Sequence, residues 1–495
     1  MKMPAPDDAL IARKGEIVRA LSRIVPGEGV VSEAADLTPF ESDGLSAYRQ
    51  RPLAVVLPET TAQVAEVLRW CQANGVKVVP RGAGTSLSGG ALPLADGVVV
   101  GLSKFNRVLE VDYANRCAVV QPGVTNLAIT EAVQAAGFYY APDPSSQIAC
   151  TIGGNVAENS GGVHCLKYGL TTNNLLGCEL VLMSGEIVRL GGKAMDADGY
   201  DLLGLVTGSE GLLGIVTEVT VRILPKPQTA QALLLGFPTV EAAGACVGDI
   251  ISAGVITAGL EMMDNPAIRA AEAFVGAGYP VDAAALLIVE LDGPEAECAE
   301  LAGHVRALAT QRGADFVRVS ASEAERLAFW AGRKAAFPAV GRIAPDYFCM
   351  DGTIPRGKLP QVLARITELS AEHGLGVANV FHAGDGNLHP LILYDADNEG
   401  ELERAEAFGA DILRLCVAVG GVLTGEHGVG VEKRDLMGEM FDATDLACQQ
   451  RVKCAFDPGL LLNPGKVFPV LHRCAELGRV HVHRGKLAFP ELPRF

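Results

Sequence analysis

Paired cysteines, long apolar runs and an excess of positive charge are all missing from this sequence. Its 12 cysteines stand singly, with no Cys-x-x-Cys pair, which argues against an iron–sulfur cluster, a zinc ribbon and a disulfide framework. The longest apolar stretch, residues 412–423, is interrupted by Arg414, so no membrane-spanning helix is predicted. The 41 basic residues are outnumbered by 58 acidic ones, and this net charge of −17 excludes nucleic acid as a partner.

Length and glycine content indicate a large globular protein that holds a ligand. A chain of 495 residues has room for two or three domains of about 150 residues each. Glycine makes up 57 of the 495 residues, above the usual share of about 7%, which suggests backbone loops held close to a ligand. Asp7 and Asp8 stand where an export signal would be positively charged, so we expect a cytoplasmic protein.

Short apolar runs and helical patterns predict an α+β fold. Extended residues 53–57 precede a helix that begins after Thr60 and ends at Asn74-Gly75. After prolines at 225 and 227, strand-like residues 233–237 precede a helical stretch at 239–253. The expected parts are an N-terminal helical segment (1–50), a first domain (51–228), a second domain (229–425), a C-terminal segment (426–470) and a tail (471–495).

Four loops of the first domain are rich in glycine and small polar residues. Residues 80–90 follow a predicted strand, and their glycines would let successive amide N–H groups converge on a pyrophosphate. The loop fails the Rossmann fingerprint, because Leu87 takes the third glycine position, and the sequence contains no Walker motif. The companion loops are residues 142–146, 152–162 and 208–216. Several such loops in one domain fit a long ligand with two phosphates.

In order and spacing these loops resemble those of the FAD-linked oxidases of the vanillyl-alcohol oxidase and p-cresol methylhydroxylase type. The resemblance spans approximately residues 35–470 and implies a two-part FAD-binding domain, an α+β cap domain with an antiparallel sheet, and a C-terminal segment that returns to the flavin. Where relatives with covalent FAD carry a histidine, this chain has Thr85, so we expect non-covalent FAD. The FAD contacts that the resemblance implies are Arg81, Gly82, Ala83, Gly84, Thr85 and Ser86 for the pyrophosphate; Pro142, Asp143, Ser145, Ser146, Gly153, Gly154, Asn155, Ser160, Gly161 and Gly162 for the ribityl and isoalloxazine; Glu210, Gly211, Gly214, Ile215 and Val216 for the adenine side; and Asn463 from the C-terminal segment.

His382 and His389 flank a predicted β-hairpin. Asp385-Gly386 is a favoured two-residue turn, and folding there pairs residues whose numbers sum to 771, so that His382 faces His389. Two imidazoles whose Cβ atoms are about 5 Å apart can bind one metal ion. The short turn at residues 425–430 offers Glu426 as a third ligand, which leaves a position open for substrate.

Within the superfamily, this pair of segments resembles the FAD-dependent D-2-hydroxy-acid dehydrogenases, which oxidise D-lactate, D-2-hydroxyglutarate or glycolate. The resemblance implies that His382, His389 and Glu426 bind a divalent ion of zinc, manganese or iron, and that His427 is the catalytic base. Arg333 is expected to hold the substrate carboxylate, because a guanidinium matches carboxylate geometry. Relatives that act on diacids carry polar residues where this chain has Phe337 and Cys349, which favours glycolate or D-lactate.

These features predict an enzyme that transfers hydride from a small 2-hydroxy acid to FAD. Reduced FAD must pass its electrons on, and we expect an iron–sulfur partner subunit, a cytochrome or a quinone, with peripheral attachment to the inner membrane through that partner. The alternatives are a D-2-hydroxyglutarate-type dehydrogenase, a flavoprotein transferase of the alkyl-dihydroxyacetonephosphate synthase type and a silent FAD-binding subunit.

Overall fold

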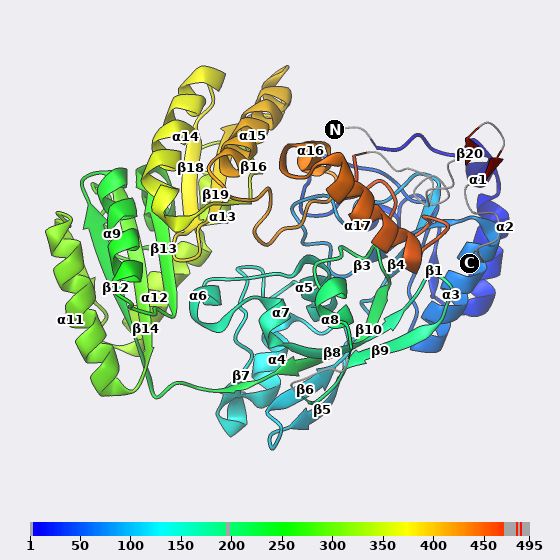
Figure 1. The fold of residues 1–495 in the computed structure, drawn as a ribbon, viewed down its shortest axis with the longest axis horizontal. Helices are drawn as coiled ribbons and strands as arrows, with labels where there is room; N and C mark the ends of the chain where they lie inside the picture. Colours follow the sequence, from blue (N-terminus) through cyan, green and yellow to red (C-terminus); the bar gives the residue numbers. More distant parts are fainter. Residues whose placement is uncertain (1–2, 195–198, 470–481, 484–485, 488–495) are drawn as a thin grey trace.

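The computed structural model describes residues 3–194, 199–469, 482–483 and 486–487, and builds them around three main sheets. Figure 1 shows the largest sheet with its helices on the left and the two smaller sheets on the right. The predicted tail falls outside the described residues, apart from β20 (Val482–His483) and β21 (Lys486–Leu487). None of the helices in the described part of the chain combines the length and apolar character needed to cross a bilayer.

The first sheet has the strand order β1-β2-β4-β3, and β2, β4 and β3 are parallel. The helix predicted after Thr60 is confirmed: the Thr60 side chain accepts a hydrogen bond from the Gln63 amide, and Gly75 ends the helix in the left-handed conformation. The predicted N-terminal segment is not wholly helical, because Val30 and Val31 pair with β2. The elements are α1 (Asp8–Ala12), α2 (Lys14–Ile24), β1 (Val30–Val31), β2 (Ala54–Val56), α3 (Thr61–Asn74), β3 (Lys77–Arg81) and β4 (Gly97–Gly101).

The second sheet is antiparallel, with the order β5-β6-β10-β8-β9. The predicted loop 152–162 is only partly a loop, because its residues 152–158 form helix α5, with Ile152 and Val156 buried in the core of this sheet. The elements are β5 (Val108–Asp112), β6 (Cys117–Val120), α4 (Asn126–Val133), β7 (Phe138–Tyr139), α5 (Ile152–Glu158), α6 (Cys165–Tyr168), α7 (Thr171–Asn174), β8 (Leu175–Val181), β9 (Ile187–Gly191), α8 (Leu202–Val206), β10 (Ile215–Arg222) and β11 (Leu224–Pro225), which pairs with β7.

The third sheet is the predicted antiparallel sheet of the second domain, with the order β15-β12-β14-β13-β18-β19-β16 and β17 at the side of β19. Helices α9, α11, α14 and α15 contribute to the core on one face, and α10, α12 and α13 to the core on the other. The elements are β12 (Thr229–Phe237), α9 (Val240–Ser252), β13 (Gly259–Asp264), α10 (Asn265–Val275), β14 (Ala285–Gly293), α11 (Glu295–Gln311), β15 (Phe316–Val319), α12 (Glu323–Lys334), α13 (Ala336–Val340), β16 (Asp346–Cys349), β17 (Gly352–Thr353), α14 (Leu359–His373), β18 (Val377–His382), β19 (Asn387–Tyr394) and α15 (Glu401–Ala418).

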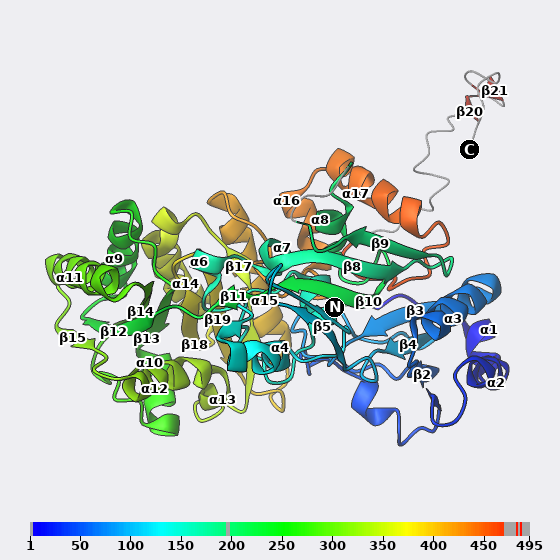
Figure 2. The same ribbon diagram turned by 90° about the horizontal axis from the view of Figure 1, so that it is seen from below.

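After α15 the chain returns to the body formed by the first two sheets. Figures 1 and 2 show α16 (Met437–Met440) and α17 (Ala443–Phe456) lying over that body, with α17 near β8 and β9. The segment beyond α17 reaches the first sheet, where Leu462 forms a parallel bridge with Val78. The C-terminal segment therefore comes back to the loops of the first domain, as the resemblance implies.

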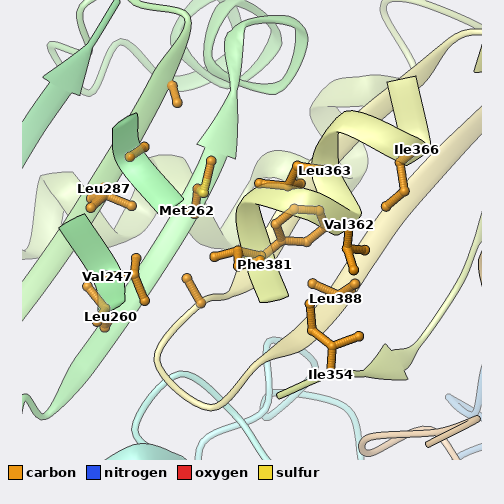
Figure 3. Packing of buried hydrophobic residues seen from close by; sticks show 14 of the residues in the cluster. Val247, Leu260, Met262, Leu287, Ile354, Val362, Leu363, Ile366, Phe381 and Leu388 are labelled. Atoms are coloured by element: carbon orange, nitrogen blue, oxygen red, sulfur yellow. The ribbon is translucent and has the colours of Figure 1, made fainter. Parts of the chain in front are cut away.

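Apolar packing fixes which face of the β18–β19 hairpin carries its histidines. Phe381 and Leu388 are paired across the two strands, and both are fully buried. Figure 3 shows them against Val362 and Leu363 of α14. Because neighbouring residues of a strand point to opposite faces, His382 and His389 must lie on the other face.

Candidate functional site

A cavity of about 690 Å³ runs between the glycine loops and the histidine hairpin. Its wall comes from all three sheets, with His382, His389, Glu426 and His427 together in one part of the lining. The predicted cofactor residues that line it are Arg81, Gly82, Ala83, Gly84, Thr85, Ser86, Ser145, Ser146, Gly153, Gly154, Asn155, Ser160, Glu210, Gly211, Gly214, Ile215 and Val216. Most of the predicted FAD contacts thus share one elongated space.

Two glycines in this wall pack so closely against neighbouring residues that no side chain fits. A Cβ atom on Gly82 would come within 2.5 Å of the Thr151 hydroxyl, and one on Gly153 within 2.5 Å of the Pro122 Cβ. Gly84 has a φ of +72°, which L side chains rarely adopt. The side-chain oxygen of Thr151 is buried without a hydrogen-bond partner among the described residues. Close backbone approach and an unpartnered donor suit an elongated, phosphate-bearing ligand.

Five of the predicted cofactor residues stand behind the cavity wall. Pro142, Asp143, Gly161, Gly162 and Asn463 are not among its lining residues. Their contacts support the residues that are: the buried Asn463 amide donates to the carbonyl oxygens of Gly90 and Glu210, at 3.1 and 2.8 Å. Asp143 pairs with His164 at 2.9 Å. These residues hold the loops in place.

The predicted register of the histidine hairpin is wrong: each residue pairs with a partner two positions away from the predicted one. His382 pairs with Asn387, and His389 with Val380, so partner numbers sum to 769 and not 771 (382 + 387; 380 + 389). The turn has four residues, and the amides of Asp385 and Gly386 both donate to the His382 carbonyl oxygen. The two histidines still meet as diagonal neighbours on one face, with ring centroids 5.0 Å apart.

Glu426 lies between the two histidines. One of its oxygens is 3.2 Å from His382 Nε2 and 3.4 Å from His389 Nε2, and the other accepts a hydrogen bond from the Gly161 amide at 3.0 Å. The possible ligand atoms of His382, His389 and Glu426 all lie within 4.8 Å of one another. Burial opposes ionisation of Glu426, but the hydrogen bond from His382 and the nearby His389 and His427 lower its pKa to about 2. The structure thus brings the three predicted metal ligands together.

His427 stacks on His389, with ring centroids 4.8 Å apart and the planes 2° from parallel. Burial and the neighbouring His389 lower the pKa of His427 to about 4, so its imidazole is neutral at pH 7. Its Nδ1 atom is buried with no hydrogen-bond partner among the described residues. A neutral imidazole in the wall of a cavity can accept a proton.

Asp351, which the sequence analysis did not single out, organises the turn that carries Glu426 and His427. Its fully buried carboxylate accepts hydrogen bonds from the amides of Gly425, Glu426 and His427, at 3.0, 3.2 and 2.9 Å. The buried Lys433 ammonium lies 3.1 Å away. Burial disfavours the charge on Asp351, but Lys433 and His427 hold its pKa well below the usual range. The sequence feature that could have drawn attention to Asp351 is the Asp-Gly pair at residues 351–352, which is typical of a turn.

Asp351, His389 and His427 form a second group whose ligand atoms lie within 4.8 Å of one another. The oxygens of Asp351 are already engaged by three amides and by Lys433. Glu426 accepts fewer donors and lies between the two hairpin histidines. The group of His382, His389 and Glu426 is therefore the better candidate for a cation.

Arg333, which is expected to hold the substrate carboxylate, is not among the residues that line the cavity. It is fully buried, and its Nε and Nη2 atoms lie 2.9 and 2.7 Å from Glu261 on β13. The physical reason is that the last turn of α12 points this side chain at the sheet. The neighbouring Lys334 does line the cavity, together with Phe337 and Tyr347, and its ammonium lies 3.5 Å from Asp143. Lys334 and Glu261 were both missed by the sequence analysis.

Comparisons with known proteins agree with this arrangement. The model for "FAD binding domain" matches residues 52–191, and that for "FAD linked oxidases, C-terminal domain" matches residues 226–467. The chain is 58% identical to glycolate oxidase subunit GlcD of Escherichia coli strain K12, over 97% of this chain and 96% of that protein. It is 40% identical to glycolate oxidase subunit GlcD of Bacillus subtilis over 87% of this chain and 92% of that one, and 32% identical to a D-lactate dehydrogenase of Anaerostipes hadrus over 91% and 97%.

Solved structures of similar fold include p-cresol methylhydroxylase with substrate bound. That structure has a TM-score of 0.78 at 17% sequence identity, and the match covers 92% of this chain and 97% of that one. An alkyldihydroxyacetonephosphate synthase structure has a TM-score of 0.71 at 18% identity, covering 94% and 86%. At these identities the likeness concerns the fold alone.

Proposed function

The chain belongs to the family of FAD-linked oxidases, and on that premise we propose that it oxidises glycolate to glyoxylate, with D-lactate as a second substrate. The observation that carries this proposal is the meeting of His382, His389, Glu426 and His427 in the wall of the FAD-sized cavity. The 58% identity to a glycolate oxidase subunit over nearly the whole chain favours glycolate as the substrate. Oxidation of a small 2-hydroxy acid is also what the D-lactate dehydrogenase relative indicates.

FAD is the cofactor that the cavity fits, because the glycine loops line a space of about 690 Å³ in which the Thr151 hydroxyl has no hydrogen-bond partner among the described residues. The loops at 81–86, 145–155 and 210–216 would hold it, behind which Asn463 and Asp143 keep the loops in place. When bound, the flavin ring supplies the acceptor for the hydride that leaves C2 of the substrate. Thr85 stands where covalently linked relatives have histidine, so we propose that FAD is held without a covalent bond.

The donor set of two imidazoles and one carboxylate suits a divalent cation. An ionised Glu426 and ring nitrogens of His382 and His389 directed at it provide three protein ligands, and zinc, manganese and iron all accept such a set. A bound ion would polarise the substrate hydroxyl and lower its pKa.

His427 is the proposed catalytic base. Its imidazole is neutral at pH 7 and lines the same cavity, and its Nδ1 atom has no competing partner among the described residues. It would take the hydroxyl proton as the C2 hydride departs, so that the products of the step are a protonated imidazole, a 2-oxo acid and a reduced flavin.

Lys334 is the proposed partner of the substrate carboxylate. Arg81 and Lys334 supply the lysine and arginine charges among the described residues of the cavity wall. Arg81 already donates to the carbonyl oxygens of Ser42 and Pro39, which leaves Lys334 to meet the substrate. Lys334 shares its part of the wall with Phe337, whose ring is 6.1 Å from that of His389. The rings of Phe337 and Tyr347 meet edge to face with their centroids 6.2 Å apart, and such aromatic walls favour a small acid over a diacid.

Electrons must leave the reduced flavin for an acceptor outside this chain. The relatives from Escherichia coli and Bacillus subtilis are both named as subunits of glycolate oxidase, which supports a partner subunit for this chain. We propose that an iron–sulfur subunit, a cytochrome or a quinone takes the electrons, and that the enzyme works in the cytoplasm, at the inner membrane through its partner.

An anaerobic titration of the FAD-loaded protein tests the function. Glycolate and D-lactate should bleach the visible flavin band, whereas L-lactate and D-2-hydroxyglutarate should bleach it far more slowly. Prior chelation should abolish the bleaching without releasing FAD, and zinc or manganese should restore it. Protein with FAD bound that none of the four acids bleaches would contradict the proposal and favour a transferase or a silent subunit.

A further inference from the structure

Glu261 is a buried carboxylate directly behind the candidate cation site. It lies on β13, between Leu260 and Met262, and is 1% exposed. Its Oε1 atom is 2.8 Å from His382 Nδ1, and its Oε2 atom is 2.9 Å from Arg333 Nε and 2.7 Å from Arg333 Nη2. Glu261 therefore connects the fully buried guanidinium to the imidazole that faces Glu426.

The contact with Glu261 determines which nitrogen of His382 is available. A carboxylate can only accept a hydrogen bond, so Nδ1 carries a proton towards Glu261 and is not available to a cation. The nitrogen that would bind a cation is Nε2, which lies 3.2 Å from Glu426. Carboxylates in this position orient metal-binding histidines and raise their basicity, and their removal typically lowers metal affinity by about 10- to 100-fold.

Arg333 fixes the orientation of the Glu261 carboxylate. Its guanidinium approaches Glu261 Oε2 through two nitrogens, which leaves Oε1 directed at His382 Nδ1. Without Arg333, Glu261 would lose the contact that holds it in place, and the His382 ring would lose its fixed orientation.

We propose that Arg333 and Glu261 act as a positioning pair that sets the affinity of the His382, His389 and Glu426 site for a divalent cation. This inference rests on the proposed function, because it assumes that the site takes up such an ion. It also assigns a role to Arg333, which is not among the residues that line the cavity.

The chain contains a matched control on the adjacent strand. Glu290 on β14 is 3% exposed and lies 3.1 Å from His164 Nε2 and 2.7 Å from Arg326. It thus forms the same type of histidine, carboxylate and arginine group, and Gly259, two residues before Glu261, pairs with Glu290. His164 is not part of the candidate cation site, so loss of Glu290 removes a buried carboxylate of equal kind without touching the metal ligands.

The test measures zinc affinity of the FAD-loaded full chain by competition with a chromophoric chelator. The variants are Glu261→Gln, Arg333→Met and Glu290→Gln. A fourth variant, His382→Ala, measures how much zinc binds outside the candidate cation site. We expect the dissociation constant to rise about 10- to 100-fold in Glu261→Gln and at least several-fold in Arg333→Met, and to change less than about twofold in Glu290→Gln. The visible FAD spectrum and the melting temperature identify variants that are folded, and Arg333→Met serves if Glu261→Gln loses FAD.

Wild-type zinc affinity in folded Glu261→Gln or in folded Arg333→Met would overturn the positioning pair while leaving the proposed function intact. An equal loss of zinc affinity in Glu290→Gln would also overturn it, because the loss would then follow from removal of any buried carboxylate in this sheet. Wild-type protein that binds no more zinc than His382→Ala would overturn the cation site itself, and with it both this inference and the metal-assisted part of the proposed function.

Discussion

Replacement of Lys334 by methionine is the sharpest test of how the substrate is held. Methionine keeps the length and apolar stem of the side chain but removes the charge from the cavity wall. The fold should tolerate the change, because the partner of Lys334, Asp143, keeps its closer contact with His164 at 2.9 Å. Any loss of turnover can therefore be assigned to substrate binding rather than to unfolding.

The size of the expected loss follows from the exposure of the ammonium. A hydrogen bond to a charged group contributes about 1.5–3 kcal/mol, and each 1.4 kcal/mol is a factor of about ten. The side chain of Lys334 is 33% exposed, so solvent screening places the loss near the lower end of this range. We expect kcat/KM for glycolate to fall by about 10- to 30-fold, mostly through KM.

The assay compares glycolate with glycolamide, which has the same hydroxyl group and no charge, using a dye as electron acceptor. Lys334→Met should lose most of the preference for glycolate, Lys334→Arg should keep part of it, and Lys358→Met, which removes an exposed charge from the same domain, should keep all of it. An unchanged kcat/KM in Lys334→Met, or an equal loss with both substrates, would refute the reasoning. If Arg333→Met alone lost the preference, the carboxylate would belong to Arg333, as the sequence first suggested.

Three further predictions concern the cofactor and the stability of the site. Acid precipitation should release FAD from the protein into the supernatant, because Thr85 offers no imidazole for a covalent bond; flavin that stays with the pellet would contradict this. Asp351→Asn should lower the free energy of unfolding in urea by about 3–5 kcal/mol, since the buried Lys433 loses its carboxylate partner at 3.1 Å and keeps the more distant one of Glu432 at 3.7 Å, and a change below about 1 kcal/mol would count against that role. Burial opposes the charge of His164, but Asp143 and Glu290 raise its pKa to about 10, above the value of about 6.5 in the unfolded chain. The stabilisation is therefore complete below about pH 6.5 and is lost as pH rises towards 10, so the melting-temperature gap between wild type and His164→Gln should be largest at pH 6 and shrink by pH 10.

Local features of the fold could be predicted well from the sequence. The Thr60 cap and the Gly75 end of α3 follow from hydrogen-bonding capacity and backbone freedom within one segment. The strand and helix expected at 233–237 and 239–253 appear as β12 and α9 for the same reason. In each case the residues that decide the structure are neighbours in the sequence.

The register of the β18–β19 hairpin could not be predicted from neighbouring residues alone. A two-residue Asp-Gly turn is the usual choice for an isolated hairpin. Here the Gly384 amide donates to the Leu260 carbonyl oxygen of β13, and Gly386 has a φ of +83°, so the turn is shaped by the next strand of the sheet. Both registers place His382 and His389 on one face, because a shift of two in the sum preserves the alternation of side chains. The two histidines therefore meet on one face although the predicted pairing was incorrect.

The residues that the sequence analysis missed share a physical cause. Glu261 acts on His382, 121 residues away in the chain, and Asp351 on Glu426, 75 residues away. Lys334 acts on Asp143, which is 191 residues away (334 − 143). Nothing in a local pattern links a single charge to so distant a partner. What a sequence does show is that Glu261 interrupts an apolar strand, and a buried charge of that kind must have a partner of opposite charge or a hydrogen-bond donor. In this chain, functional residues other than the candidate ligands are therefore to be sought among charged residues that lie within apolar strands or at the ends of helices.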